Sequence, residues 1–143
     1  MNTDFTVNYS DRLNVVRWPF VFERDGDHFI DRMKEPSSFN EVKEKIYDVC
    51  QKSVENILAD KQYNGDSVKQ WSEDIVRSTL RELNGSGFQP FKYLANCMIL
   101  SKRSSGVHTV TMSLWDPTLD GTTSYQWAND TMQCILTVWG MKF

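Results

Sequence analysis

The chain has 143 residues, a formal net charge of −3, 40% hydrophobic residues and 13% aromatic residues. This length gives room for one compact domain, and the composition is that of a globular chain rather than a disordered one. The slight acidic excess argues against nucleic acid or a membrane surface as partner, because both attract basic proteins. The apolar runs are also too short to span a membrane. We therefore expect a soluble intracellular protein.

The first 36 residues form an arm that is richer in aromatic residues than flexible tails usually are. Trp18, Phe20 and Phe22 alternate, so an extended chain places them on one face. Pro19 cannot donate to a strand ladder, which confines such a strand to a sheet edge. We predict that these three aromatic residues dock on a neighbouring chain. The alternative is a loosely ordered tail.

Two amphipathic helices follow the arm. Ser38 and Glu41 have the spacing of a capping box, and apolar residues then recur every three or four positions, which predicts a helix over 39–59. A second helical repeat lies between Asn64-Gly65 and Asn84-Gly85, which predicts a helix over 67–83.

From Pro90 onward the apolar period changes to two, which predicts strands over 92–101, 108–115, 123–127 and 132–139. Two helices followed by four strands indicate an α+β fold, with the helices covering one face of a four-stranded antiparallel sheet. The first and last strands are apolar on both sides, more than a single copy should expose. A twin subunit is the simplest cover for the second face.

No set of residues in the chain points to catalysis or to a cofactor. His28 and His108 are the only histidines, and His108 lies in a predicted strand, where a structural role is expected. The residues 84–87 follow a helix and lack the lysine of a phosphate-binding loop, so a helix cap is the better interpretation. Cys50, Cys97 and Cys134 have no paired spacing, and we expect free buried thiols. We predict no catalytic, cofactor-binding or metal residues.

Over residues 40–143 an ordered series of short motifs resembles the Tctex-type dynein light chain family. The motifs are Tyr63 with Val68-Lys69-Gln70-Trp71, Pro90-Phe91-Lys92-Tyr93 with Cys97-Met98-Ile99-Leu100, Gly106-Val107-His108-Thr109, Trp115-Asp116 with Asp120-Gly121, Trp127, Asn129, Thr131-Met132, Cys134-Ile135 and Gly140. The arm resembles no part of the family. We therefore expect an arm over 1–36 and a light-chain domain over 37–143.

The resemblance implies a dimer that exchanges the second strand between subunits, and a non-catalytic role in joining dynein intermediate chains. An exchanged strand leaves a groove in which an extended peptide can add as a further strand. We place this dimer strand and peptide groove at Val107, His108, Thr109, Val110, Thr111, Met112, Ser113, Leu114 and Trp115. Alternatively, these residues only build the dimer core.

The arm and departures from the family pattern such as Ala128, Asp130 and Gln133 favour a specialised member, a light chain of axonemal outer-arm dynein in the cilium. A cytoplasmic dynein light chain and a dynein-independent peptide adaptor are the alternatives. The expected partners are a dynein intermediate chain and a second light chain, either an identical copy or a related Tctex-type chain. The arm is expected to dock on a dynein chain or on that second light chain. The expected location is the cytoplasm and its cytoskeleton.

Overall fold

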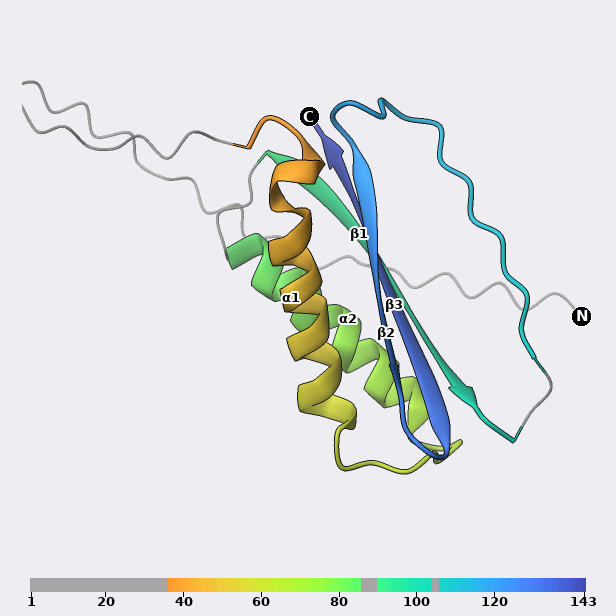
Figure 1. The fold of residues 1–143 in the computed structure, drawn as a ribbon. Helices are drawn as coiled ribbons and strands as arrows, with labels where there is room; N and C mark the ends of the chain where they lie inside the picture. Colours follow the sequence, from red (N-terminus) through yellow and green to blue (C-terminus); the bar gives the residue numbers. More distant parts are fainter. Residues whose placement is uncertain (1–35, 86–89, 104–105) are drawn as a thin grey trace, which may run out of the picture. The chain divides into compact units, whose positions relative to one another are not determined.

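The computed structural model describes residues 36–85, 90–103 and 106–143. In these ranges helix α1 (Phe39–Leu58) and helix α2 (Val68–Gly85) precede strands β1 (Phe91–Ser101), β2 (Gly121–Ala128) and β3 (Met132–Lys142). Both helices lie on one face of the sheet (Figure 1). The predicted α+β class is confirmed, and both helices and three of the predicted strands are found with ends shifted by no more than a few residues. The predicted arm residues Trp18, Phe20 and Phe22 lie outside the described ranges.

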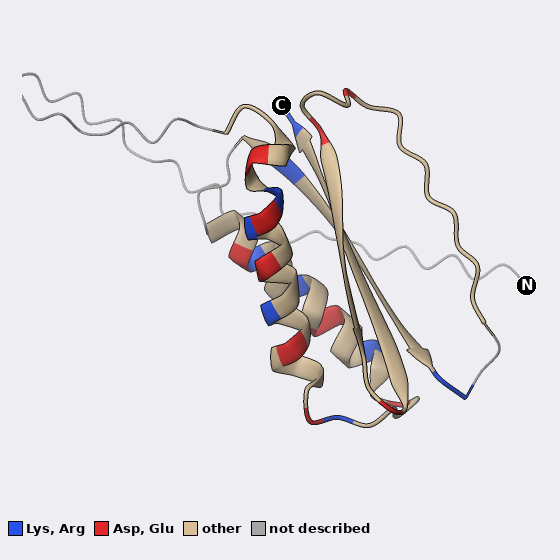
Figure 2. Cartoon of the chain, viewed as in Figure 1, with Lys and Arg blue, Asp and Glu red and all other residues tan. Residues whose placement is uncertain are grey.

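Helix α1 forms because one of its faces is continuously apolar. Phe39, Ile46, Val54 and Leu58 are fully buried, whereas the charged residues of the helix are exposed apart from the half-buried Glu55. Figure 2 shows where the charged residues lie along the helix. The helix begins next to Ser38, as predicted, but the side chain of Ser38 makes no capping hydrogen bond.

The partner of Glu41 at this helix start is Ser37 instead. The backbone N–H of Ser37 donates to Glu41 Oε2 at 3.0 Å, and the Ser37 hydroxyl donates to Glu41 Oε1. The predicted capping box was therefore wrong by one residue. The spacing of a serine and a glutamate does not decide which neighbouring serine turns toward the carboxylate.

The sheet has the order β1-β3-β2, and both pairings are antiparallel. The central strand β3 alternates strictly, because Cys134, Leu136 and Val138 are fully buried against the helices. The intervening residues Ile135, Thr137 and Trp139 point to the opposite face, which we call the outer face. Strands β1 and β2 each have one hydrogen-bonded neighbour in the described part of the chain, so both lateral edges of the sheet are unpaired.

The predicted fourth strand is not a strand in the single chain. Residues 107–115, which we call the unpaired segment, are described without regular secondary structure and run past the outer face (Figure 1). The alternating pattern of this segment is that of a strand, but a strand requires a neighbouring backbone. The described sheet of this chain does not supply one, so three of the four predicted strands are found in the described residues and the fourth is not confirmed.

The aromatic ring of Phe39, at the start of α1, packs closely against the backbone of β2 and β3. Gly121 and Gly140 are paired in register, and an added Cβ on either glycine would lie 2.4 Å from a carbon of the Phe39 ring. Glycine is required at both positions because the ring approaches the backbone so closely. The Phe39 N–H also donates to Leu119 O at 2.8 Å, which ties the helix to the loop before β2.

Candidate functional site

The unpaired segment carries the two most exposed large apolar side chains of the described residues, Met112 and Leu114. Val110, Met112 and Leu114 are 68%, 90% and 105% exposed, and Val107 is 57% exposed. A single chain thus leaves a continuous apolar stripe in water. Exposed stripes of this kind mark surfaces that another molecule covers.

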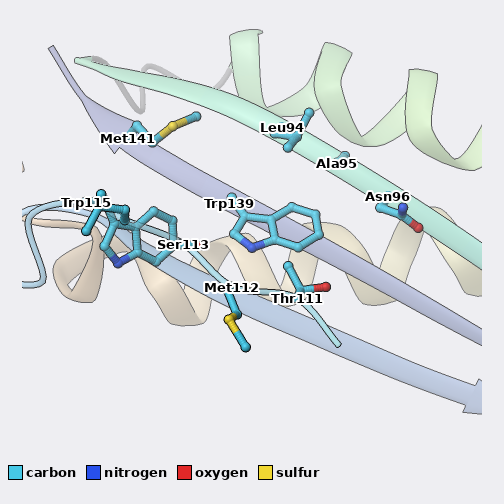
Figure 3. A pocket seen from close by; sticks show the side chains of 10 residues that line it. Leu94, Ala95, Asn96, Thr111, Met112, Ser113, Trp115, Trp139 and Met141 are labelled. Carbon is cyan, nitrogen blue, oxygen red and sulfur yellow. The ribbon is translucent and has the colours of Figure 1, made fainter. Parts of the chain in front are cut away.

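The other side of the segment faces the outer face of the sheet across two hollows. The first has a volume of about 430 Å³ and lies between Thr111 to Trp115 on one side and Leu94, Trp139 and Met141 on the other. Figure 3 shows the Trp139 indole in this hollow, with Met112 extending away from it. The segment therefore does not pack onto its own sheet.

The second hollow, of about 460 Å³, is lined largely by hydroxyl groups. Thr109, Thr111 and Ser113 of the segment face a floor of β2 and β3 residues. In this floor Ser124 and Thr137 share a hydrogen bond of 2.8 Å between their hydroxyls, and Thr122 Oγ1 donates to Val138 O at 3.0 Å. The hydroxyl groups of the floor are thus already hydrogen-bonded, and Ile135 and Trp139 add apolar surface. An uncharged protein surface can therefore pack against this floor at little cost.

Charged groups are nearly absent from this side of the molecule. The unpaired segment and β2 contain no Lys, Arg, Asp or Glu, whereas both helices carry many such residues (Figure 2). Recognition of nucleic acid depends on cationic groups that neutralise phosphates. An uncharged face with apolar stripes fits another protein chain instead.

The free edge of β2 adjoins a groove that the sequence interpretation missed. The groove has a volume of about 530 Å³ and is lined by Lys43, Glu44, Tyr47 and Asp48 of α1 and by Thr123 of β2. Tyr47 is 40% exposed, and its ring packs edge-to-face on the Tyr125 ring with 5.4 Å between the ring centroids. The only sequence signal was a tyrosine on the charged face of an amphipathic helix.

Beneath this groove a hydrogen-bond network joins β2 to α1. The Tyr125 hydroxyl donates to Glu55 Oε1 at 2.7 Å, and the Gln51 side-chain amide donates to the same oxygen at 3.0 Å. These bonds hold the pKa of the Glu55 carboxyl below its ordinary value, and burial raises the pKa of Tyr125 to about 12. The network fixes β2 against α1 and leaves the free edge of β2 accessible.

Asn129 holds the turn between β2 and β3 in place by several side-chain hydrogen bonds. Its side-chain amide donates to Lys61 O at 2.7 Å, and its side-chain oxygen accepts hydrogen bonds from Thr131 and from the Met132 N–H. The Thr131 hydroxyl also accepts from the Tyr63 N–H at 2.9 Å. The turn between β2 and β3 is thereby attached to the connection between the helices, which places these residues in a structural role.

Nothing in the described ranges forms a metal centre or a membrane-spanning helix. These ranges hold no group of three or more His, Cys, Asp or Glu side chains that could bind a metal ion. No helix within them has the length and apolarity that crossing a bilayer requires. His108 lies exposed in the unpaired segment rather than in a packed strand as expected.

Comparison with known proteins assigns the family. A sequence model of the Tctex-1 family matches residues 40–141, which include the unpaired segment and both helices and three strands except for the first residue of α1 and the last residue of β3. This chain belongs to the Tctex-1 family. Residues 1–39 lie outside the matched range, so the whole arm (1–36) has no counterpart in the family model.

Relatives in this family carry the name dynein light chain. The chain is 36% identical to the Dictyostelium discoideum "Dynein light chain Tctex-type" over 101 residues, which cover 71% of this chain and 91% of that protein. It is 33% identical to the human "Dynein light chain Tctex-type 3" over 98 residues, covering 68% and 84%. With the Drosophila melanogaster "Dynein light chain Tctex-type" it shares 29% over 112 residues, covering 78% and 98%.

Proposed function

We propose that this Tctex-1 family chain is a non-catalytic light chain of a dynein motor that dimerises and binds a dynein intermediate chain. The observation that carries the proposal is the unpaired segment, an apolar strand-like stretch. Among the residues that the structure describes it has no strand partner, and the sheet beside it has free edges. The names of the relatives supply the dynein context. In this proposal the chain consists of an arm (1–36) and a light-chain domain (37–143).

Dimerisation proceeds by exchange of the unpaired segment. In each subunit the segment of the partner adds to the free edge of β2, where the groove beside Tyr47 can receive alternate side chains. The apolar stripe of Val110, Met112 and Leu114 is then covered. Burying a side chain of this size contributes about 1.5–3 kcal/mol, so each segment gains roughly 4–9 kcal/mol before ordering and association costs.

The exchanged strand has a second edge, and a segment of the dynein intermediate chain adds there as a further strand. Main-chain hydrogen bonds then supply affinity, and alternate side chains from Val107 to Trp115 supply selectivity. Two such grooves in a dimer raise the effective concentration for two linked peptide segments. The second light chain is either an identical copy or a related Tctex-type chain.

A charge placed on the apolar stripe tests the exchange. Leu114 is fully exposed in the single chain, so Leu114→Lys should leave the fold intact and weaken the dimer. Losing about 2 kcal/mol of burial corresponds to roughly a 30-fold higher dimer dissociation constant. Gln62→Lys, which adds the same charge at an exposed loop position, is the matched control. Equal dimer affinity for both variants in analytical ultracentrifugation would contradict the exchange.

Co-purification from cells tests the dynein assignment. The tagged chain should recover a dynein intermediate chain, and Leu114→Lys should recover less of it than Gln62→Lys. Recovery without any intermediate chain, from cells that contain dynein, would reject the assignment. If most of the cellular pool migrates apart from dynein on a density gradient, the chain is instead a dynein-independent adaptor.

The proposed motor is axonemal outer-arm dynein, which places the protein in the cilium, with a cytoplasmic motor as the alternative. The support is the arm, which the family match leaves outside its range. We propose that Trp18, Phe20 and Phe22 dock on a neighbouring dynein chain or on the partner light chain. Removing residues 1–34 should reduce incorporation into the motor while the dimer stays folded. Unchanged incorporation would contradict this role of the arm.

A further inference from the structure

Two cysteines lie in contact on the helix-facing side of the sheet. The sulfur atoms of Cys97 on β1 and Cys134 on β3 are 3.6 Å apart and share a hydrogen bond. In the strand register Cys97 is opposite Leu136 and Cys134 is opposite Ile99, so the two cysteines are diagonal neighbours. Their positions in the sequence did not predict this pair.

We propose that Cys97 and Cys134 form an oxidation site at which a peroxide converts the two thiols into a disulfide that joins β1 to β3. A disulfide has a sulfur–sulfur distance of about 2.05 Å, so the sulfurs must approach by roughly 1.5 Å. Within residues 36–85, 90–103 and 106–143, β1 is hydrogen-bonded to a strand on one side only, and an edge strand can shift more easily than a central one. Because both sulfurs point into their own subunit, this site does not depend on the proposed dimer.

The chemistry of the pair differs from that of the third cysteine. The hydrogen bond between the two sulfurs lowers the pKa of Cys134, while the same bond, together with burial, raises the pKa of Cys97. Burial raises the pKa of Cys50 to about 12, although a backbone hydrogen bond acts in the opposite direction. Because thiolates are the reactive form, the lowered pKa makes Cys134 the sulfur that attacks the peroxide, and Cys97 is the sulfur that then closes the disulfide. Cys50 is fully buried and its pKa is raised, so it is expected to stay inert. Cys97 is only partly buried and gives the oxidant access from the edge strand.

The reaction balances with hydrogen peroxide as the oxidant. One sulfur attacks a peroxide oxygen, the O–O bond breaks, and a sulfenic acid and one water result. The second sulfur then attacks the sulfenic sulfur, the S–S bond forms, and the S–O bond breaks with release of a second water. The two thiols lose two protons and two electrons, and the peroxide is reduced to two waters. A dithiol reductant reduces this disulfide back to two thiols.

Thiol counting on the purified full chain tests the site. Hydrogen peroxide should lower the number of titratable thiols in the denatured protein from three to one, and peptide mapping should find Cys97 linked to Cys134 within one chain. Dithiothreitol should restore all three. Cys50→Ala should form the same bond, whereas Cys97→Ala should form none.

Persistence of all three thiols after treatment would overturn the proposal. A linkage that involves Cys50, a linkage between two chains, or oxidation of single cysteines to sulfinic acid would also overturn it. If Cys97→Ala fails to fold, the mapped linkage in the wild type and in Cys50→Ala decides the question by itself.

Discussion

Replacing Gly140 by alanine should destabilise the protein, because Phe39 occupies the space that a Cβ needs. The added carbon would lie 2.4 Å and 2.6 Å from two ring carbons of Phe39, and 3.3 Å from Tyr93 Cε1. Carbon atoms in contact stay about 3.5–4.0 Å apart, so the ring would have to retreat by more than about 1 Å.

The Phe39 ring has no room for such a movement. Gly121 bounds the ring on its other side so closely that a Cβ there would also lie 2.4 Å from a ring carbon. The ring is fully buried, and it packs edge-to-face on the Phe91 ring with 6.2 Å between the ring centroids. The Phe39 N–H is held by Leu119 O. We therefore expect Gly140→Ala to lower the free energy of unfolding by about 1–3 kcal/mol, the usual cost of overpacking.

Urea unfolding at fixed protein concentration measures this cost, since the stability of a dimer depends on concentration. Gly65→Ala is the control, because nothing lies within 4 Å of its added Cβ, and a change within about 0.5 kcal/mol is expected. In a Phe39→Ala background the cost of Gly140→Ala should largely disappear, which gives a coupling energy of about 1–3 kcal/mol. A Gly140→Ala variant as stable as the wild type, or additive effects in the double variant, would refute the reasoning.

Two further predictions concern the polar contacts that hold the sheet. Asn129→Asp keeps the acceptor oxygen for Met132 but loses the donor to Lys61 O; we expect a loss of about 1–3 kcal/mol in urea unfolding, and Asn129→Ala should cost more. Equal stability of the two variants would contradict the roles assigned to the amide. Tyr125→Phe removes the main cause of the lowered Glu55 pKa. A carboxyl group whose pKa is lower in the folded state stabilises the fold at pH values above its unfolded-state pKa. This stabilisation is lost as the pH falls through the folded-state pKa. The stability difference between wild type and Tyr125→Phe should thus shrink on acidification in thermal unfolding, and a difference that grows would contradict this account.

The sequence predicted the helices and strands well where a short stretch contains its own signal. The apolar repeat of α1 predicted a helix over 39–59 and the structure has Phe39–Leu58, while the change to period two located β1 and β3. These patterns are local, because a helix makes its hydrogen bonds within itself and one buried face repeats every few residues. The capping contact was missed because Ser37 and Ser38 differ only in how their side chains turn.

The candidate site could be predicted only in part. The pattern from Val107 to Trp115 indicated an extended, alternating stretch, and the structure shows that its apolar side is exposed. The groove beside Tyr47 and the contact between Cys97 and Cys134 could not be predicted, because both bring together residues from elements that are distant in the sequence. No spacing rule connects such positions.

By itself the sequence determined the α+β class, the extents of the helices and strands, and an apolar sheet too large for a single helical layer to cover. The tertiary structure decided that β3 lies between β1 and β2, that both lateral edges of the described sheet are free, and that residues 107–115 lack a strand neighbour within the described part of the chain. The physical reason is that an alternating pattern specifies which side chains share a face of a strand. Which backbone completes the ladder depends on where the rest of the chain, or another chain, places its hydrogen-bonding groups.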